Sequence, residues 1–232
     1  NGGVMTVAPG LLWVRLPLPF QLNHINVWLI EDGDGWFLID TGCNTEEINR
    51  AWENLFSGVM ENKPITRLAV THGHVDHVGL AGKITSRFGA HYVGTFGEWV
   101  WARIAHTKDF PGSNMALHDF LLGHGFEDAQ VRNMVQTRSH FIDLSTPVPP
   151  AISEIRDGDT IEIAGRPWQI LVTKGHAFEH SSFYDPAENV IIVGDHLLPN
   201  ISPVIAVDEM IPGADPLKDF LESFSRFSDI PS

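Results

Sequence analysis

Runs of apolar positions predict several short strands in the first third of the chain. Residues 4–16, 25–30 and 36–39 are each typical of strands, and Asp32-Gly33-Asp34-Gly35 separates the last two. Asp and Gly tolerate the positive φ that tight turns demand, so this tetrapeptide predicts a hairpin. Residues 65–70 form a further apolar run and predict another short strand.

Two helices are expected around that strand. Asn44 is interpreted as an N-cap with Glu47 three residues later, and apolar residues then recur at helical spacing over 48–59. This helix should lay one face on the sheet. A second helix is predicted at 79–88, followed by a short strand at 91–93.

The region from 95 to 140 has no strand pattern, and its apolar spacing predicts two or three helices. It contains the aromatic residues Trp99, Trp101, Phe110 and Phe120. We expect these helices to form a lid that gives an apolar part of a substrate something to bury against.

Strand patterns resume in the last third of the chain. Residues 160–163 and 168–172 predict one pair of strands, and 181–184 and 190–193 predict another. A helix is expected at 216–227 near the end of the sequence.

The densest cluster of potential metal-binding side chains lies directly after the strand at 65–70. His72, His74, Asp76 and His77 fall within six residues. Neutral His and Asp gain little from burial unless something binds them, so this spacing indicates a metal site on a loop braced by rigid elements. The alternative, a solvated histidine-rich loop, would need neither the apolar strand nor the ordered spacing.

The pattern His72-x-His74-x-Asp76-His77 resembles the signature of the metallo-β-lactamase superfamily. Three other stretches resemble its first, third and fourth motifs in the expected order. These are Leu38-Ile39-Asp40-Thr41-Gly42, Lys174-Gly175-His176 and Val193-Gly194-Asp195-His196.

The resemblance implies an α/β fold, an αββα sandwich of two mixed β-sheets with helices on the outside. The region at about 95–140 would then be a helical insertion, and residues 1–232 a single domain. The superfamily's second metal normally takes a final histidine downstream of the fourth motif, but no histidine follows His196. We therefore expect this chain to lack the C-terminal end of its domain and to hold a second metal weakly, unless His180 or His196 has taken the missing role.

The resemblance also implies six metal ligands, three for a first metal, two for a second, and one that bridges them. These are His72, His74 and His176, then Asp76 and His77, and finally Asp195. Zinc is the expected metal, as one or two ions, with iron or manganese as alternatives. The rival interpretations are a buried structural histidine for His176 and a turn aspartate for Asp195.

Three further roles are expected from the same motifs. Asp40 should accept a hydrogen bond from a ligand imidazole and fix its tautomer. Asp76 and His180 are the candidate catalytic residues, Asp76 through the second metal. His180 either holds its loop by hydrogen bonding or lies close to the substrate, and Glu179 precedes it where the familiar third motif has glycine.

Composition limits the classes of binding partner that we expect. The formal charge of −14 makes the chain a poor counterion for phosphate backbones, so no nucleic-acid partner is expected. No run approaches the roughly 18 apolar residues that would span a bilayer, so no membrane partner is expected either. The single Cys43 rules out an internal disulfide, which fits a cytoplasmic location. A leader could already have been removed before Asn1, and the oligomeric state stays open.

The expected function is a metal-dependent hydrolase that uses a metal-bound hydroxide to hydrolyse a small ester, thioester or lactone. Asp195 points to the glyoxalase II, lactonase and ribonuclease-like branches rather than to the true β-lactamases, and the negative charge weighs against a nuclease. A serine mechanism is not supported, since no Gly-x-Ser-x-Gly elbow is present. The alternatives are a phosphodiesterase or nuclease, a β-lactam hydrolase, or a non-hydrolytic di-iron oxidoreductase or binding domain.

Overall fold

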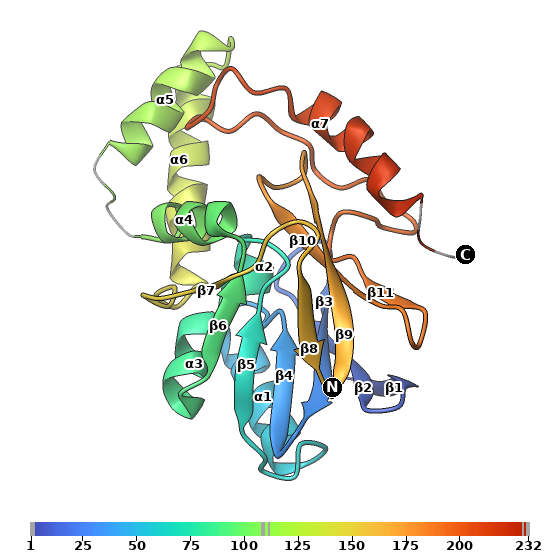
Figure 1. Cartoon of the computed structure of the whole chain (residues 1–232). Helices are drawn as coiled ribbons and strands as arrows, with labels where there is room; N and C mark the ends of the chain where they lie inside the picture. Colours follow the sequence, from blue (N-terminus) through green and yellow to red (C-terminus); the bar gives the residue numbers. More distant parts are fainter. Residues whose placement is uncertain (1–2, 108–109, 111, 229, 231–232) are drawn as a thin grey trace.

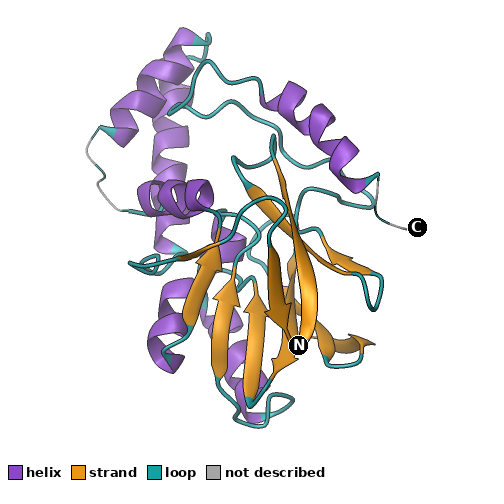
Figure 2. Ribbon diagram, viewed as in Figure 1, coloured by secondary structure: helices purple, strands orange, loops and turns teal. Residues whose placement is uncertain are grey.

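Two β-sheets face each other in the computed structural model, which describes residues 3–107, 110, 112–228 and 230 (Figures 1 and 2). Helices α1 (Glu46–Ser57) and α3 (Ala81–Phe88) pack on the outer face of the larger sheet. Helix α7 (Pro216–Ser223) contacts the smaller one. The predicted αββα sandwich is therefore confirmed.

The larger sheet is mixed, as expected. Its strands follow chain order, with antiparallel pairing from β1 to β4 and parallel pairing from β4 to β7. The strands are β1 (Gly3–Ala8), β2 (Leu11–Pro17), β3 (His24–Asp32), β4 (Gly35–Ile39), β5 (Ile65–Ala69), β6 (His91–Gly94) and β7 (Ser153–Glu154).

The smaller sheet has the order β11-β10-β9-β8, and all of its described pairs are antiparallel. Since β9 and β11 both run opposite to β10, their carboxyl ends lie at the same edge. The strands are β8 (Thr160–Ile163), β9 (Arg166–Thr173), β10 (His180–Asp185) and β11 (Val190–Ile192).

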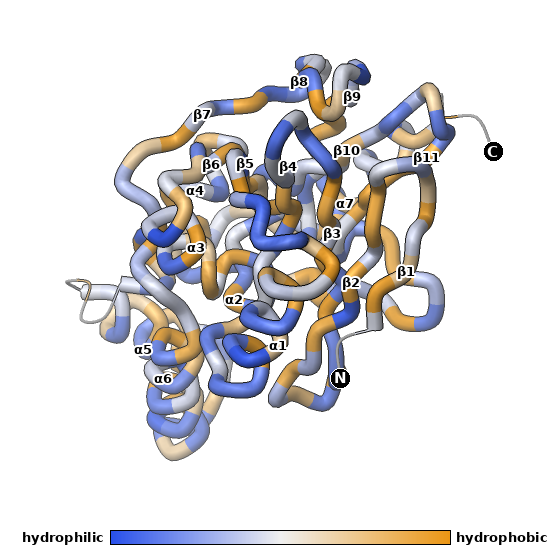
Figure 3. Tube along the Cα trace, turned by 90° about the horizontal axis from the view of Figure 1, so that it is seen from below, coloured by the Kyte–Doolittle hydropathy of each residue, from blue (hydrophilic) through white to orange (hydrophobic). Residues whose placement is uncertain are grey.

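Two apolar cores hold these layers together. Between the sheets, Phe37 of β4 meets Phe183 of β10 at 6.5 Å between ring centroids, and Trp168 is fully buried beside them. Between the larger sheet and the helices, Trp52 stacks on Phe56 at 5.4 Å. Figure 3 shows the apolar positions concentrated along the central strands and polar positions at the turns. Burial of apolar surface on both faces therefore fixes the larger sheet between two layers.

The start of α1 differs from the sequence prediction. The N-cap is Thr45 rather than Asn44, because the Thr45 hydroxyl accepts a hydrogen bond from the Ile48 N–H at 3.2 Å. The backbone N–H of Asn44 instead donates to the Leu144 carbonyl at 2.7 Å. The Asn44 prediction was wrong because two adjacent residues can both cap, and a distant backbone contact decides between them.

Among its described residues, the region expected to be a helical insertion contains three helices, α4 (Phe96–Ala105), α5 (Ser113–Gly123) and α6 (Asp128–Asp143). Figure 1 shows α4 above the ends of β5 and β6, while α5 and α6 extend away from the sheets. The chain between β11 and α7 reaches across to this insertion, where Arg138 pairs with Glu209. Within the described residues, no helix combines the length and the apolar character needed to cross a membrane.

Candidate metal centre

The predicted ligands meet at one edge of the sandwich, because each follows the carboxyl end of a strand. Asp40 follows β4, and the His72–His77 loop follows β5, the parallel neighbour of β4. His176 and Asp195 follow β9 and β11 in the other sheet. Asp76 and His77 also lie in a one-turn helix, α2 (Val75–Val78), which comes before the helix expected at 79–88.

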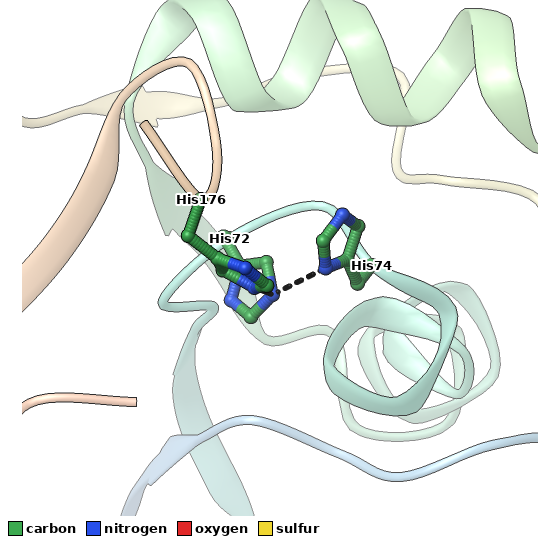
Figure 4. Close-up of side chains that lie close together, drawn as sticks. All are labelled: His72, His74 and His176. Carbon is green, nitrogen blue, oxygen red and sulfur yellow. Dashed lines mark hydrogen bonds between the residues drawn. The ribbon is translucent and has the colours of Figure 1, made fainter. Parts of the chain in front are cut away.

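Three imidazoles form the first group that could hold a metal ion. His72, His74 and His176 place one nitrogen each within 4.8 Å of the others. Nε2 of His72 lies 2.9 Å from Nδ1 of His74 and 3.2 Å from Nε2 of His176. Figure 4 shows these three rings converging from the β5 loop and the β9 loop.

Hydrogen bonds on the far side of these rings fix which nitrogen faces the centre. The His176 Nδ1–H donates to the Val204 carbonyl at 2.8 Å, so its Nε2 carries a lone pair. The Thr71 hydroxyl donates to Asp40 at 2.9 Å and lies 3.1 Å from His72 Nδ1, so that nitrogen is the donor and His72 Nε2 also carries a lone pair. Two lone pairs 3.2 Å apart repel unless a cation lies between them. The donor set therefore fits a divalent metal.

A second group shares His72 and adds His77 and Asp195. The His77 Nδ1–H donates to Asp40 at 2.8 Å, while its Nε2 is buried without a hydrogen-bond partner. That nitrogen lies 3.4 Å from Asp195 and 3.8 Å from Asp76. An unpartnered buried nitrogen facing two carboxylates is an arrangement that a metal ion completes.

Asp195 belongs to the second group and also faces His176 of the first. One carboxylate oxygen is 3.4 Å from His77 Nε2, and the other is 3.9 Å from His176 Nε2. This is the position that a bridging ligand would need. Asp76 stands further out and belongs to neither group within the described residues, so its place on a second metal stays a prediction.

The two groups differ in charge. Burial, with neighbouring imidazoles, lowers the pKa of His74 to about 3 and the pKa of His72 well below its usual value. Burial also disfavours a charged His77, but the carboxylates of Asp40, Asp195 and Asp76 outweigh it and raise the His77 pKa well above its usual value. The second group therefore attracts positive charge, which a metal ion supplies as well as a proton does.

Asp40 supports the candidate ligands through hydrogen bonds and is 1% exposed. Its two oxygens accept the Thr71 N–H at 2.7 Å, the Thr71 hydroxyl at 2.9 Å and the His77 Nδ1–H at 2.8 Å. The carboxylate thus contacts a candidate ligand imidazole in the way expected from the sequence. Its backbone φ of 64° lies in the left-handed region, which Asp tolerates better than most residues.

His180 and His196 lie behind the site and are fully buried. The His180 ring stacks on His72 at 5.1 Å, and the His196 ring stacks on Phe227 at 5.6 Å. Neither histidine belongs to either metal group within the described part of the chain. In this structure His180 supports the His72 ring and has no solvent-facing surface from which to touch a substrate, so a catalytic role for it stays a prediction.

Of the four aromatics expected in the lid, Trp101 contacts a site histidine. Its ring meets His74 edge-on at 5.4 Å between centroids. Trp99 instead donates to the Pro149 carbonyl, and Phe120 packs on His124. Phe110 lines a separate cavity with Trp99. The lid over the site is therefore formed by α4 and not by the whole insertion.

Glu98 on α4 is a site residue that the sequence analysis missed. It is 2% exposed, and its two oxygens accept the Gly73 N–H at 2.7 Å and the Glu179 N–H at 2.8 Å. Gly73 lies between His72 and His74, and Glu179 lies between His176 and His180. The carboxylate thus ties the two ligand loops together. The available signal was an acidic residue inside the otherwise apolar stretch from Phe96 to Trp101.

We expect Glu98→Gln to weaken zinc binding about 10- to 100-fold, because the amide replaces one acceptor oxygen by a donor that faces a backbone N–H. Competition titration with a chromophoric chelator measures the affinity. Glu47→Gln on the exposed side of α1 is the matched control and should bind zinc like the parent protein. Unchanged zinc affinity in the Glu98 variant would show that the two loops hold their positions without this carboxylate.

Known proteins share this fold. The profile of the metallo-beta-lactamase superfamily matches residues 21–225. A probable metallo-hydrolase of Bacillus subtilis (strain 168), YqjP, is 26% identical over 94% of this chain and 67% of its own length. The crystal structure of a beta-lactamase domain protein from Burkholderia ambifaria matches with a TM-score of 0.85 and 33% identity, over 98% of this chain and 67% of that one.

A metallo-beta-lactamase family protein from Thermus thermophilus matches with a TM-score of 0.82 and 28% identity, over 97% of this chain and 71% of that one. The chain thus spans roughly two thirds of the length of such relatives. Together with the two His/Asp groups, these relatives support an enzyme of the metal-dependent hydrolase class. The chain belongs to the metallo-beta-lactamase superfamily.

Proposed function

We propose that this protein is a dinuclear metal hydrolase acting on a small ester, thioester or lactone. The observation that carries the proposal is the position of Asp195, whose two oxygens face His77 in one metal group and His176 in the other. A carboxylate placed in this way can hold two cations side by side. Zinc is the proposed metal, and iron or manganese would suit the same nitrogen and oxygen donors.

When bound, two divalent cations lower the pKa of water to about 7, so that hydroxide is available, and they stabilise the oxyanion that forms at an attacked carbonyl. The protein's own residues prepare this chemistry. Thr71 and Asp40 hold the His72 and His77 rings in the tautomers that present Nε2 to the centre. The Val204 carbonyl does the same for His176. Trp101 covers His74 and limits the access of bulk water.

A substrate panel tests the proposal. Metal-loaded protein should hydrolyse thioesters, simple esters or lactones, and should turn over phosphodiesters and β-lactams poorly. Preferred turnover of a phosphodiester or a β-lactam would replace the proposed substrate class. A visible absorption band together with absent hydrolysis would favour the di-iron oxidoreductase, because di-zinc sites absorb no visible light.

A further inference from the structure

A cavity of about 720 Å³ opens beside His74 and His176, beneath α4. Pockets for small ligands usually measure about 300–1,000 Å³, so this one is large enough for a substrate whose reacting bond lies at the metal groups. It is bounded on one side by α4 and on the other by residues 204–211, here called the wall segment.

The walls of the cavity are mainly apolar, although they line an open space. In the wall segment, Ile211 is 48% exposed and Met210 is 37% exposed. Apolar side chains left accessible around a concavity gain free energy when an apolar group enters and displaces water. The apolar side chains that carry the argument are Val100, Trp101, Ile104, Val207, Met210 and Ile211.

The charges around the cavity do not suit an anionic ligand. Its described lining contains one basic residue, Lys174, against five acidic residues. Four of those acids already have a hydrogen-bond or ion-pair partner. Asp208 accepts the Trp101 indole N–H, and Glu209 pairs with Arg138. Glu98 and Glu179 each accept a backbone N–H, and the fifth acid is Asp219. Lys174 is thus the one described lysine or arginine of the lining that could pair with a phosphate-rich or polycarboxylate group along the walls.

Three contacts hold the wall segment in place. The Trp101 Nε1–H donates to Asp208 at 2.9 Å, and Arg138 on α6 pairs with Glu209. At the other end, the Val204 carbonyl accepts the His176 Nδ1–H at 2.8 Å. The segment is thus fixed both to the insertion and to a candidate metal ligand, so its apolar side chains face the site in a defined position.

We propose that the cavity binds the uncharged apolar acyl group of the substrate and that the wall segment determines which acyl lengths fit. This inference rests on the proposed hydrolase function for the position of the reacting carbonyl at the metals. It deepens that proposal by assigning the substrate class, which is a neutral ester or lactone with an aliphatic acyl chain.

The test uses p-nitrophenyl acetate, butyrate, hexanoate and octanoate with the metal-loaded protein. We expect kcat/KM to rise about two- to fourfold for each added methylene until the cavity is filled. Met210→Ser should flatten that rise. Met115→Ser, a matched change on exposed α5 away from the cavity, should keep it. Calorimetric binding of 1-octanol provides a second measurement that does not require turnover.

The outcomes separate the two proposals. If the esters are hydrolysed without any dependence on acyl length, the acyl cavity is wrong and the hydrolase stands. If no ester, thioester or lactone of the panel is hydrolysed but 1-octanol binds more weakly to Met210→Ser than to Met115→Ser, the hydrolase is wrong and the apolar cavity stands. Equal 1-octanol binding by both variants overturns the cavity.

Discussion

Asp195→Asn is expected to lower kcat/KM by about 10²- to 10³-fold, comparable to the loss of one strong transition-state contact. The asparagine keeps the size of the side chain but removes the negative charge that faces both metal groups. Burial opposes this charge, yet His77 and the other nearby imidazoles lower the Asp195 pKa below its usual value. The carboxylate is therefore ionised and matched to cations. Steady-state kinetics with a good substrate from the panel, together with metal analysis, measures the effect.

The expected metal content is one tightly bound ion per variant chain, because the three imidazoles of the first group remain. Chelated parent protein supplies the reference without metal and should show no measurable hydrolysis. Asp119→Asn on the exposed surface of α5 is the control and should behave like the parent. Substantial turnover by the chelated parent would rule out metal chemistry, and parent-like kinetics in the Asp195 variant would remove the bridging role.

Asp40→Asn is expected to reduce both stability and metal affinity. The three donors around Asp40 then face one oxygen and one amide N–H₂, so at least one of them loses its acceptor. Leaving such a buried donor unpaired costs about 1–3 kcal/mol of unfolding free energy, and more where the acceptor was charged. Zinc affinity should fall about 10- to 100-fold, because the His77 ring loses the bond that fixes its tautomer.

Chemical unfolding with and without zinc, together with competition titration, separates the two effects. Asparagine tolerates the left-handed backbone at this position, so the substitution changes the carboxylate without adding backbone strain. Asp34→Asn in the exposed hairpin turn is the matched control. A less stable Asp40 variant with parent-like zinc affinity would limit Asp40 to a structural role.

The sequence predicted those parts of the site that depend on local spacing. His72, His74, Asp76 and His77 are close in sequence, so a motif suffices to name them as candidates, and the structure brings three of them into the two groups. His176 and Asp195 follow apolar strands, and the pairing of those strands brings both to one edge. The sandwich was implied by the resemblance of the four motifs to the superfamily, and the strands expected from the apolar runs form its two sheets.

Features that depend on contacts between residues distant in sequence could not be predicted from sequence patterns. Glu98 acquires its role only because α4 crosses above the β5 loop, and no local pattern reports that crossing. The two-residue strand β7 is too short to give a periodic signal. His180 follows a recognisable motif, but only the three-dimensional structure shows that its ring stacks behind His72. In each case tertiary contacts decide the role of the residue.

Val204 takes part in two binding equilibria, that of the metal ion and that of the molecule in the cavity. Its side chain borders the cavity, and its carbonyl holds His176. An occupant that shifts this backbone changes the free energy of metal binding, and thermodynamic reciprocity requires the metal to change the affinity for that occupant by the same factor. Zinc titrations with and without 1-octanol measure this coupling. A change in zinc affinity caused by 1-octanol would equal the change in 1-octanol affinity caused by zinc.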